Sequence, residues 1–180
     1  MRIISGNCRG RKLVNLQGHA IRPTADRTRE AVFSILGQKV RKAKVLDLFA
    51  GTGALGIEAL SRWACHATFI DLACDIIHQN LELCRFKEKS TVISCDIVKD
   101  CIPEILNGQQ FDLVFIDPPY KKGYIEHTLQ KESFTDLLAK DCIIIAEQSC
   151  TENLQLELST LDIYRQKKYS KTIVSFINKI

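Results

Sequence analysis

The stretch that decides the fold is residues 45–56, which read VLDLFAGTGALG. Its first half is largely apolar, as in a buried strand, and its second half is a G-x-G-x-x-G turn that leads into a helical stretch. Glycines at such a turn let a ligand approach the backbone and let the helix pack closely on the strand. The stretch therefore predicts an α/β fold with a ligand site at the carboxyl end of this strand.

Short β-rich runs alternate with helical stretches after residue 45, which is typical of a mostly parallel sheet. The expected strands are residues 45–49, 67–71, 91–95, 112–116 and 142–147. A helix is expected over residues 73–86, with Asn80 on its apolar face as a satisfied hydrogen-bonding residue. Residues 161–169 and 171–177 lie too close together for a crossover helix, so they predict a terminal antiparallel hairpin.

The segment before residue 45 is expected to add a hairpin and a helix to this core. Residues 2–5 and 9–14 flank the turn 6–8 and predict antiparallel pairing. In the helix that follows, Thr24 or Asp26 is the expected N-cap, and Gly37 is the expected end. The organisation predicted is one domain, with an extension over residues 1–44 and a core over residues 45–180.

Composition places the chain among ordinary soluble domains, because 46% of its 180 residues are apolar and 26% are charged. No apolar run approaches the length that crosses a bilayer, so a cytoplasmic location is expected. The eight cysteines form no C-x-x-C pair and are interpreted as reduced apolar residues. Cys74 and His78 have a metal-like spacing but lack further ligands nearby, so no metal is expected.

Charge is divided unevenly along the chain. Residues 1–44 hold 11 Lys/Arg against two acidic residues, whereas residues 45–180 hold 14 against 19. A basic segment on an acidic body is typical of an arm that binds a polyanion. Charge alone leaves a solvated surface equally open.

Three acidic residues at successive strand ends favour one particular ligand of the glycine turn. Ile57 stands where a phosphate-binding loop needs Lys, and Asp47 would repel a pyrophosphate. S-adenosylmethionine carries a sulfonium and an ammonium, so Asp47 is expected to offset its positive charge, directly or through water. Asp71 is placed to accept from the ribose hydroxyls, and Asp96, with the Ile97 backbone, faces the adenine. The residues expected to bind this cofactor are Asp47, Phe49, Ala50, Gly51, Thr52, Gly53, Asp71, Leu72, Asp96 and Ile97.

The fourth expected strand ends in the tetrapeptide Asp117-Pro118-Pro119-Tyr120. Two prolines stiffen the turn between a carboxylate and an aromatic ring. If Asp117 and the Pro118 carbonyl accept both N–H groups of a nucleobase amine, the nitrogen lone pair can attack a methyl group, with Tyr120 stacked on the base. Asp117, Pro118, Pro119 and Tyr120 are therefore the candidate catalytic residues, acting on a flipped or unpaired nucleotide.

The chain resembles the RsmD family of bacterial 16S ribosomal RNA guanine-N2 methyltransferases. The tetrapeptide is similar to the (Asp/Asn/Ser)-Pro-Pro-(Tyr/Phe) motif of amino-directed class I methyltransferases. Further similarity to the family lies in residues 2–6, 9–13, 22–33, 47–62 and 117–123, so it covers essentially the whole chain.

The resemblance implies a Rossmann-like, seven-stranded, mostly parallel sheet with an antiparallel last strand. It also implies S-adenosylmethionine as methyl donor and guanine N2 of 16S rRNA, within an assembling small subunit, as acceptor. We expect a monomer that needs neither a membrane nor a metal. The basic residues expected to contact RNA are Arg2, Arg9, Arg11, Lys12, Arg22, Arg27 and Arg29.

Three positions depart from the family pattern. Trp63 stands where a helix-ending Gly is usual, Asp71 where Glu is commoner, and Ser170 where the terminal hairpin usually has Gly. Asp71 is one methylene shorter but still able to reach a ribose. Trp63 and Ser170 bear on local backbone geometry and not on the activity.

Three alternative functions stay open at this point. A DNA adenine-N6 methyltransferase uses a similar tetrapeptide, although the chain shows no separate target-recognition domain. A non-catalytic RNA-binding assembly factor could keep the fold, although the intact tetrapeptide argues against it. The glycine turn alone would also suit a nicotinamide-dependent oxidoreductase.

Overall fold

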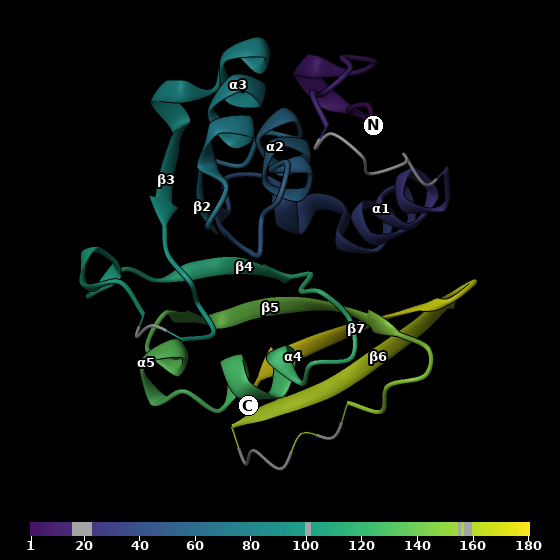
Figure 1. Cartoon of the computed structure of the whole chain (residues 1–180), viewed down its shortest axis with the longest axis vertical. Helices are drawn as coiled ribbons and strands as arrows, with labels where there is room; N and C mark the ends of the chain where they lie inside the picture. Colours follow the sequence, from purple (N-terminus) through teal and green to yellow (C-terminus); the bar gives the residue numbers. More distant parts are fainter. Residues whose placement is uncertain (16–22, 100–101, 155, 157–159) are drawn as a thin grey trace.

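The computed structural model describes residues 1–15, 23–99, 102–154, 156 and 160–180. Its framework is a seven-stranded sheet with the order β3-β2-β1-β4-β5-β7-β6 (Figure 1). The strands are β1 (Lys44–Leu48), β2 (His66–Asp71), β3 (Ser90–Ser94), β4 (Phe111–Ile116), β5 (Leu138–Ser149), β6 (Leu161–Tyr169) and β7 (Thr172–Lys179). Neighbouring strands from β1 to β5 pair in parallel, whereas β7 pairs antiparallel with both β5 and β6.

Helices cover both faces of the sheet. One face carries α1 (Pro23–Leu36), α2 (Ala54–Ser61) and α3 (Cys74–Cys84), and the other carries α4 (Tyr124–Leu129) and α5 (Glu132–Thr135). Short 3-10 turns complete the described elements: η1 (Gly6–Cys8), η2 (Gly37–Val40), η3 (Lys87–Lys89) and η4 (Glu104–Leu106). No helix among the described residues is both long and apolar enough to cross a bilayer.

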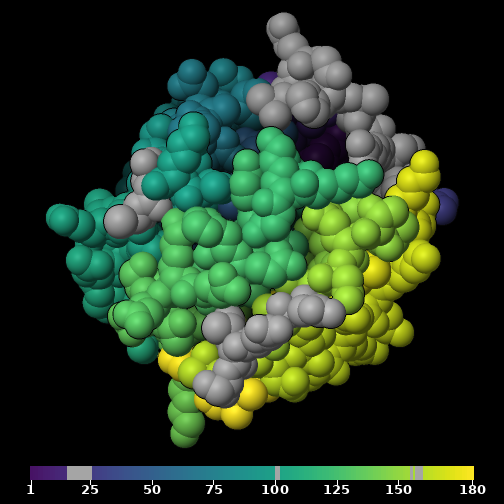
Figure 2. Space-filling model, turned by 60° about the horizontal axis from the view of Figure 1, so that its bottom comes forward, coloured from purple at the N-terminus to yellow at the C-terminus, as the bar shows by residue number. Residues whose placement is uncertain are grey.

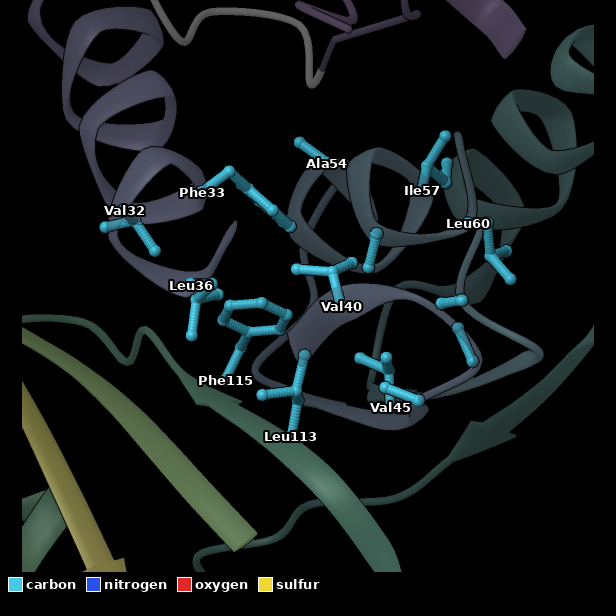
Figure 3. Packing of buried hydrophobic residues seen from close by; sticks show 14 of the residues in the cluster. Val32, Phe33, Leu36, Val40, Val45, Ala54, Ile57, Leu60, Leu113 and Phe115 are labelled. Carbon is cyan, nitrogen blue, oxygen red and sulfur yellow. The ribbon is translucent and has the colours of Figure 1, made fainter. Parts of the chain in front are cut away.

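The central strands are buried on both faces, which explains why they read as apolar runs. Val45 of β1 points into the core under α1 and α2, while Leu46 and Leu48 point into the core under α4 and α5. Figure 3 shows the first of these cores, where α1 lies over β4 through a tilted ring contact of Phe33 with Phe115, 5.6 Å between centroids. The carboxyl ends of β1, β2, β3 and β4 therefore have a rigid base.

All seven strands predicted from the sequence are confirmed, including the terminal antiparallel hairpin, and the class I methyltransferase sheet is the observed fold. Two details differ. The first helix begins at Pro23, so Thr24 and Asp26 lie inside it and the prediction that one of them caps it is wrong. Helices α4 and α5 were not predicted, because each is too short to show a helical period.

The amino-terminal segment pairs with itself without forming regular strands. The Ile3 amide donates to the Arg11 carbonyl at 2.9 Å, and the Ile3 carbonyl accepts from the Gly10 amide at 2.8 Å. The β-pairing described in this segment is a single antiparallel bridge between Arg2 and Lys12. Gly6 has φ +81°, and a Cβ there would lie 1.8 Å from the Ser61 carbonyl oxygen. The expected hairpin is thus replaced by an irregular one, because the turn is pressed against α2.

Both departures from the family's glycines adopt the left-handed conformation. Trp63 has φ 69° directly after α2, and Ser170 has φ 55° in the β6–β7 turn. Arg41 lies over the Trp63 ring, 5.1 Å from its centroid. The expectation that these two positions concern local backbone geometry is confirmed.

Candidate active site at the carboxyl edge of the sheet

The loops that follow β1, β2, β3 and β4 meet at one edge of the sheet. Parallel register places Leu48 beside Ile70 on one side and Ile116 on the other, and Asp71 beside Ser94. The glycine turn is therefore flanked by the loop after Asp71 and by the turn that begins at Asp117. Ligands of open α/β sheets bind at this kind of edge.

The glycine turn curls through three left-handed residues: Phe49 (φ 58°), Gly51 (φ 55°) and Gly53 (φ 74°). Its ends are pinned, because Ala50 donates to the Ile70 carbonyl at 3.2 Å and Gly53 donates to the Ala50 carbonyl at 2.7 Å. At Gly56 a Cβ would lie 2.4 Å from the Phe69 ring, so this glycine is required for α2 to approach β2. These hydrogen bonds fix the shape of the turn, which we call the cradle, and at Gly51 a Cβ would meet no atom closer than 4.0 Å, so a ligand could approach the backbone there.

Asp47 lies beneath this cradle and not on its open side. Its side chain is 1% exposed, and Oδ2 accepts from the Gly56 amide at 2.8 Å. Burial raises the pKa of Asp47 to about 8, with the charge of Asp71 adding to the rise and the Gly56 hydrogen bond opposing it. A positive ligand on the cradle would relieve this desolvated carboxyl, acting across the loop backbone.

Asp71 lies at the surface end of β2 and touches the glycine turn. Oδ2 accepts from the Gly51 amide at 2.8 Å, and Oδ1 accepts from the Ala73 amide at 2.9 Å. Each carboxylate oxygen has a second lone pair for another donor. Leu72 beside it is 67% exposed, an apolar surface at the same edge. These two residues fit the hydroxyls and the apolar ring of a nucleoside.

Asp96 follows β3 and closes its own turn. Oδ1 accepts from the Val98 amide at 3.2 Å and the Lys99 amide at 3.4 Å, and Lys99 forms an ion pair with Oδ2 at 3.4 Å. The Ile97 side chain is buried, and its carbonyl accepts from Lys131 Nζ at 2.7 Å. Because these groups already have partners within the protein, the predicted contact with adenine would have to be made from the solvent side of the turn at Asp96 and Ile97.

The turn Asp117–Tyr120 extends β4 at this edge. Asp117 is half-buried, Pro118 is buried and Pro119 is exposed. Tyr120 Oη donates to Glu147 Oε1 at 2.7 Å and lies 3.2 Å from Thr172 Oγ1. Burial, with the charge of Glu147 next in size, raises the pKa of Tyr120 well above its usual value. The phenol is thus a neutral, anchored ring.

Four residues that the sequence analysis did not assign to the site hold these loops in place. Tyr124, the first residue of α4, stacks on Phe49 with 6.1 Å between centroids and 2° between planes, so the segment after Asp117–Tyr120 contacts the glycine turn. Glu152 accepts from the Lys121 amide at 2.6 Å and the Ser149 amide at 2.9 Å. Glu147 and Thr172 anchor Tyr120. Apart from the Glu152–Ser149 contact, these pairs join residues that are distant in sequence, so no local pattern could have indicated them.

Asn80 of α3 links the cofactor edge to the amino-terminal segment. It is fully buried, accepts from the Val14 amide at 2.7 Å, and donates to the carbonyls of Val14 at 3.1 Å and Thr52 at 2.9 Å. The prediction of a satisfied hydrogen-bonding residue on the buried face is confirmed. Asn80 holds the glycine turn through the Thr52 carbonyl.

The predicted RNA-contact residues differ in their surroundings. Arg2, Arg9, Lys12 and Arg27 are exposed. Arg11 is exposed too, but its guanidinium donates to the Leu83 carbonyl at the end of α3. Arg22 lies outside the described residues.

The prediction that Arg29 contacts RNA is wrong, because its side chain is buried and paired within the protein. It is 4% exposed, forms an ion pair with Asp26 at 3.0 Å, donates to the Arg2 carbonyl and lies 3.7 Å from Glu58. Its charge is used inside the protein, because Glu58 is fully buried and also binds Arg62 at 2.7 Å. Arg29 is therefore a structural residue.

Within the described part of the chain, no group of three His, Cys, Asp or Glu side chains could hold a metal ion. The polar groups at this edge are instead carboxylates and backbone amides around an apolar surface. These groups suit a positively charged ligand that contains a nucleoside.

Comparison with known proteins gives one consistent result. The family model described as conserved hypothetical protein 95 matches residues 1–178. The chain is 33% identical to the ribosomal RNA small subunit methyltransferase D of Escherichia coli, over 93% of this chain and 84% of that protein. The solved structure of the methyltransferase candidate yhhF from Escherichia coli has a TM-score of 0.85 and 32% identity, covering 99% of this chain and 97% of that one.

A more distant solved structure, a methyltransferase candidate complexed with SAH, has a TM-score of 0.62 and 16% identity over 88% of this chain and 50% of that one. Identity this low shows a shared fold alone.

Proposed function

Because the chain belongs to the conserved hypothetical protein 95 family, which includes the ribosomal RNA small subunit methyltransferases D, we propose that it methylates small-subunit ribosomal RNA with S-adenosylmethionine as donor. The single observation that carries this proposal is the position of Asp117–Tyr120 directly beside the glycine turn, through the Leu48–Ile116 register and the Phe49–Tyr124 stack. The acceptor we propose is the exocyclic N2 amine of a guanine.

The residues of the glycine turn and its neighbours hold the donor. The backbone of residues 49–53 forms the cradle, Asp71 accepts from the ribose hydroxyls, and the turn at Asp96 and Ile97 borders the adenine. Asp47 lies below the cradle, where burial raises its pKa to about 8, and a cation bound above it would favour the ionised carboxylate. When bound, S-adenosylmethionine supplies a methyl carbon that its sulfonium makes electrophilic.

The catalytic turn prepares the acceptor nitrogen. Asp117 and the Pro118 carbonyl accept its two N–H bonds, which turns the lone pair out of conjugation with the ring and towards the methyl carbon. Tyr120 stacks on the base and is kept in place by Glu147 and Thr172. The nitrogen becomes acidic only after the new N–C bond has formed, so its proton can leave to water, and catalysis consists chiefly of positioning and charge stabilisation.

The exposed cations of the amino-terminal segment contact the RNA backbone in this proposal. Arg2, Arg9, Lys12 and Arg27 are available, while Arg11 combines a contact with α3 and an exposed position. The substrate is 16S rRNA in an assembling small subunit, and the enzyme acts in the cytoplasm as a monomer. The location is supported by the seven described cysteines, which are all free, as in a reducing compartment, and the monomeric state is supported by the fact that one chain supplies every proposed site residue.

The decisive experiment measures transfer of labelled methyl from S-adenosylmethionine to unmodified 16S rRNA, to small subunits lacking the modification, and to duplex DNA. We expect N2-methylguanine in digested rRNA and no label in DNA. Asp117→Ala should abolish transfer while retaining donor binding. Label in adenine of DNA would instead identify the DNA adenine-N6 alternative, and binding without transfer in the unaltered protein would identify the assembly factor. Thermal shifts with nicotinamide dinucleotide and no shift with S-adenosylmethionine would favour the oxidoreductase.

A further inference from the structure

The outer edge of the sheet carries a second concentration of positive charge. β6 is the last strand in the sheet order, so among the described residues one side of it has no partner strand. Residues 163–180 contain five Lys/Arg and no acidic residue, whereas residues 45–162 contain nine Lys/Arg and 19 Asp/Glu. Four of these cations lie at or near the exposed strand and its turn: Arg165, Lys167, Lys168 and Lys171. We call this set, with Tyr164, the β6 edge.

An exposed aromatic ring lies within the β6 edge. Tyr164 is 46% exposed and leans on Phe176, with 6.3 Å between ring centroids and 56° between planes. A supported ring among cations is the arrangement that single-stranded nucleic acid uses, because bases stack on the ring while phosphates pair with Lys and Arg. The pairing of Arg165 with Phe176 and of Lys167 with Val174 places both cations on the sheet face of that ring.

The β6 edge leads directly to the catalytic turn. Tyr169 pairs with Thr172 at the closed end of the hairpin, and Thr172 Oγ1 lies 3.2 Å from Tyr120 Oη. Lys171 is in the turn between them, held by a 2.8 Å hydrogen bond from the Cys150 amide to its carbonyl. Figure 2 shows the yellow hairpin bordering the green segment that carries α4 and the loop before it. An RNA strand that places a base on Tyr120 would therefore run past this edge.

We propose that the β6 edge binds the phosphate backbone of the RNA strand next to the target nucleotide. This proposal rests on the proposed function for the identity of the substrate and extends it with a second contact surface, at the opposite end of the chain from the amino-terminal cations. The two basic segments are separated in the sequence by residues 45–162, in which acidic residues outnumber basic ones 19 to nine, and this excess of negative charge disfavours RNA binding elsewhere.

Lysines on an edge strand also have a purely structural use, since they prevent edge-to-edge pairing with another sheet. The two roles respond differently to charge reversal. Glutamate on an edge prevents such pairing as well as lysine does, but it repels phosphate. A Lys→Glu substitution therefore leaves the protective role intact and removes only the role that we propose.

The test compares Lys167→Glu/Lys168→Glu with Lys89→Glu/Lys140→Glu, a control with the same change in net charge. Lys89 and Lys140 are exposed and lie towards the amino ends of β3 and β5, at the sheet edge opposite the site. The probe is 16S rRNA transcribed in vitro, which carries no modification. Binding is measured by filter retention from about 50 to about 200 mM salt, where each phosphate contact contributes about 0.7 to 0.9 to the slope of log K against log salt.

We expect the β6-edge variant to lose about 1 to 2 units of that slope and to raise the KM for rRNA about tenfold or more. Its kcat at saturating RNA, its affinity for S-adenosylmethionine and its monomeric elution should match the unaltered protein. The control variant should keep most of the slope.

Three results would overturn the proposal: an unchanged slope, an equal loss in the control, or normal binding of naked rRNA with reduced methylation of assembled subunits. The last would identify a ribosomal protein as the partner of this edge. If the unaltered protein binds rRNA with the expected slope but methylates none, the proposed function fails while the surface stands.

Discussion

At the scale of single residues, the buried carboxyl group of Asp47 destabilises the folded protein when it is ionised. Its carboxyl group is desolvated under the glycine turn, and its pKa is raised from 3.8 to about 8. Between those values the folded protein holds a proton that the unfolded chain has released. This group therefore lowers stability as pH rises through that window, the reverse of a carboxylate held by an ion pair.

We predict that Asp47→Asn removes this pH dependence. Asparagine can still accept from the Gly56 amide and carries no buried charge. Relative to the variant, the unaltered protein should lose at most about 1.4 kcal/mol of unfolding free energy per pH unit between about pH 5 and about pH 7.5. The same variant should bind S-adenosylmethionine more weakly, because an amide does not offset a cation. Denaturant unfolding at several pH values and calorimetric titration measure the two effects, and exposed Asp141→Asn is the control. Parallel pH profiles for all three proteins would contradict the prediction.

Tyr120 is the residue at which anchoring and stacking can be separated. Tyr120→Phe loses the hydrogen bonds to Glu147 and Thr172 but keeps the ring, so kcat should fall by about three- to tenfold, the value of one or two such bonds. Tyr120→Ala also loses stacking, worth a further about 1 to 3 kcal/mol. Neither variant should change donor affinity.

A double-mutant cycle in methyl-transfer assays checks this assignment. Glu147→Gln keeps an acceptor for the phenol and should retain most activity. Tyr120→Phe combined with Glu147→Leu should be no slower than the slower of the two single variants, because both remove the same bond. Additive losses would mean that Glu147 acts elsewhere.

At the scale of elements, the amino-terminal segment owes its shape to α1 and α2. Glu58 of α2 accepts from the amides of Ile4 at 2.8 Å and Ser5 at 3.1 Å, and the Arg29 guanidinium lies against the same carboxylate. Ser61 Oγ accepts from Cys8 at 2.9 Å and donates to the Ser5 carbonyl at 2.6 Å. The segment is thus bonded to a helix instead of to a neighbouring strand.

This arrangement predicts a structural phenotype for Arg29. Arg29→Ala should reduce the free energy of unfolding by about 3 kcal/mol, because it leaves part of the buried Glu58 charge without a partner. RNA bound by the folded protein should keep the same salt slope, in contrast to a residue that contacts phosphate. Chemical denaturation and filter binding at low temperature check both. A lower slope with normal stability would restore Arg29 to the RNA-contact set.

The strands of the core could be predicted from sequence because local pattern and tertiary position agree there. Residues 45–48 and 111–116 are apolar except for Asp47 and Asp112, and this composition, which is visible in the local sequence, reflects burial on both faces of the sheet. The irregular pairing around Gly6 could not be predicted, since its cause is Ser61, more than fifty positions away. The α4 and α5 turns are likewise stabilised by tertiary packing of Ile125, Leu129 and Phe134.

At the scale of the whole molecule, the positions of the candidate site residues followed from one rule about parallel sheets. The strand ends at Asp47, Asp71, Asp96 and Asp117 were assigned to a common edge, and the observed register brings those loops together. Their partners could not be deduced, because Glu147, Glu152, Thr172 and Tyr124 belong to contacts between distant segments. The basic residues of β6 were also missed, because the net charge was summed over all of residues 45–180, where acidic residues predominate.

The global charge pattern predicts how the amino-terminal cations act. Charge reversal at Arg9 and Lys12, whose side chains are exposed, should raise the KM for rRNA and reduce the salt slope by about 1 to 2 units. Donor affinity should stay unchanged. Arg11 is a poorer choice because its guanidinium caps α3 at the Leu83 carbonyl. Filter binding and initial rates measure these effects, and an unaltered slope would remove these cations from the RNA surface.

The hydrogen bonds of Asn80 have a mechanical consequence for the enzyme cycle. The side-chain amide of Asn80 forms hydrogen bonds with the backbone at both Val14 and Thr52, so it connects the amino-terminal segment to the glycine turn. A displacement of the chain at Val14 would therefore strain the hydrogen bond that holds Thr52. If the two segments bind RNA and the methyl donor as proposed, binding of one substrate would affect the loop that receives the other.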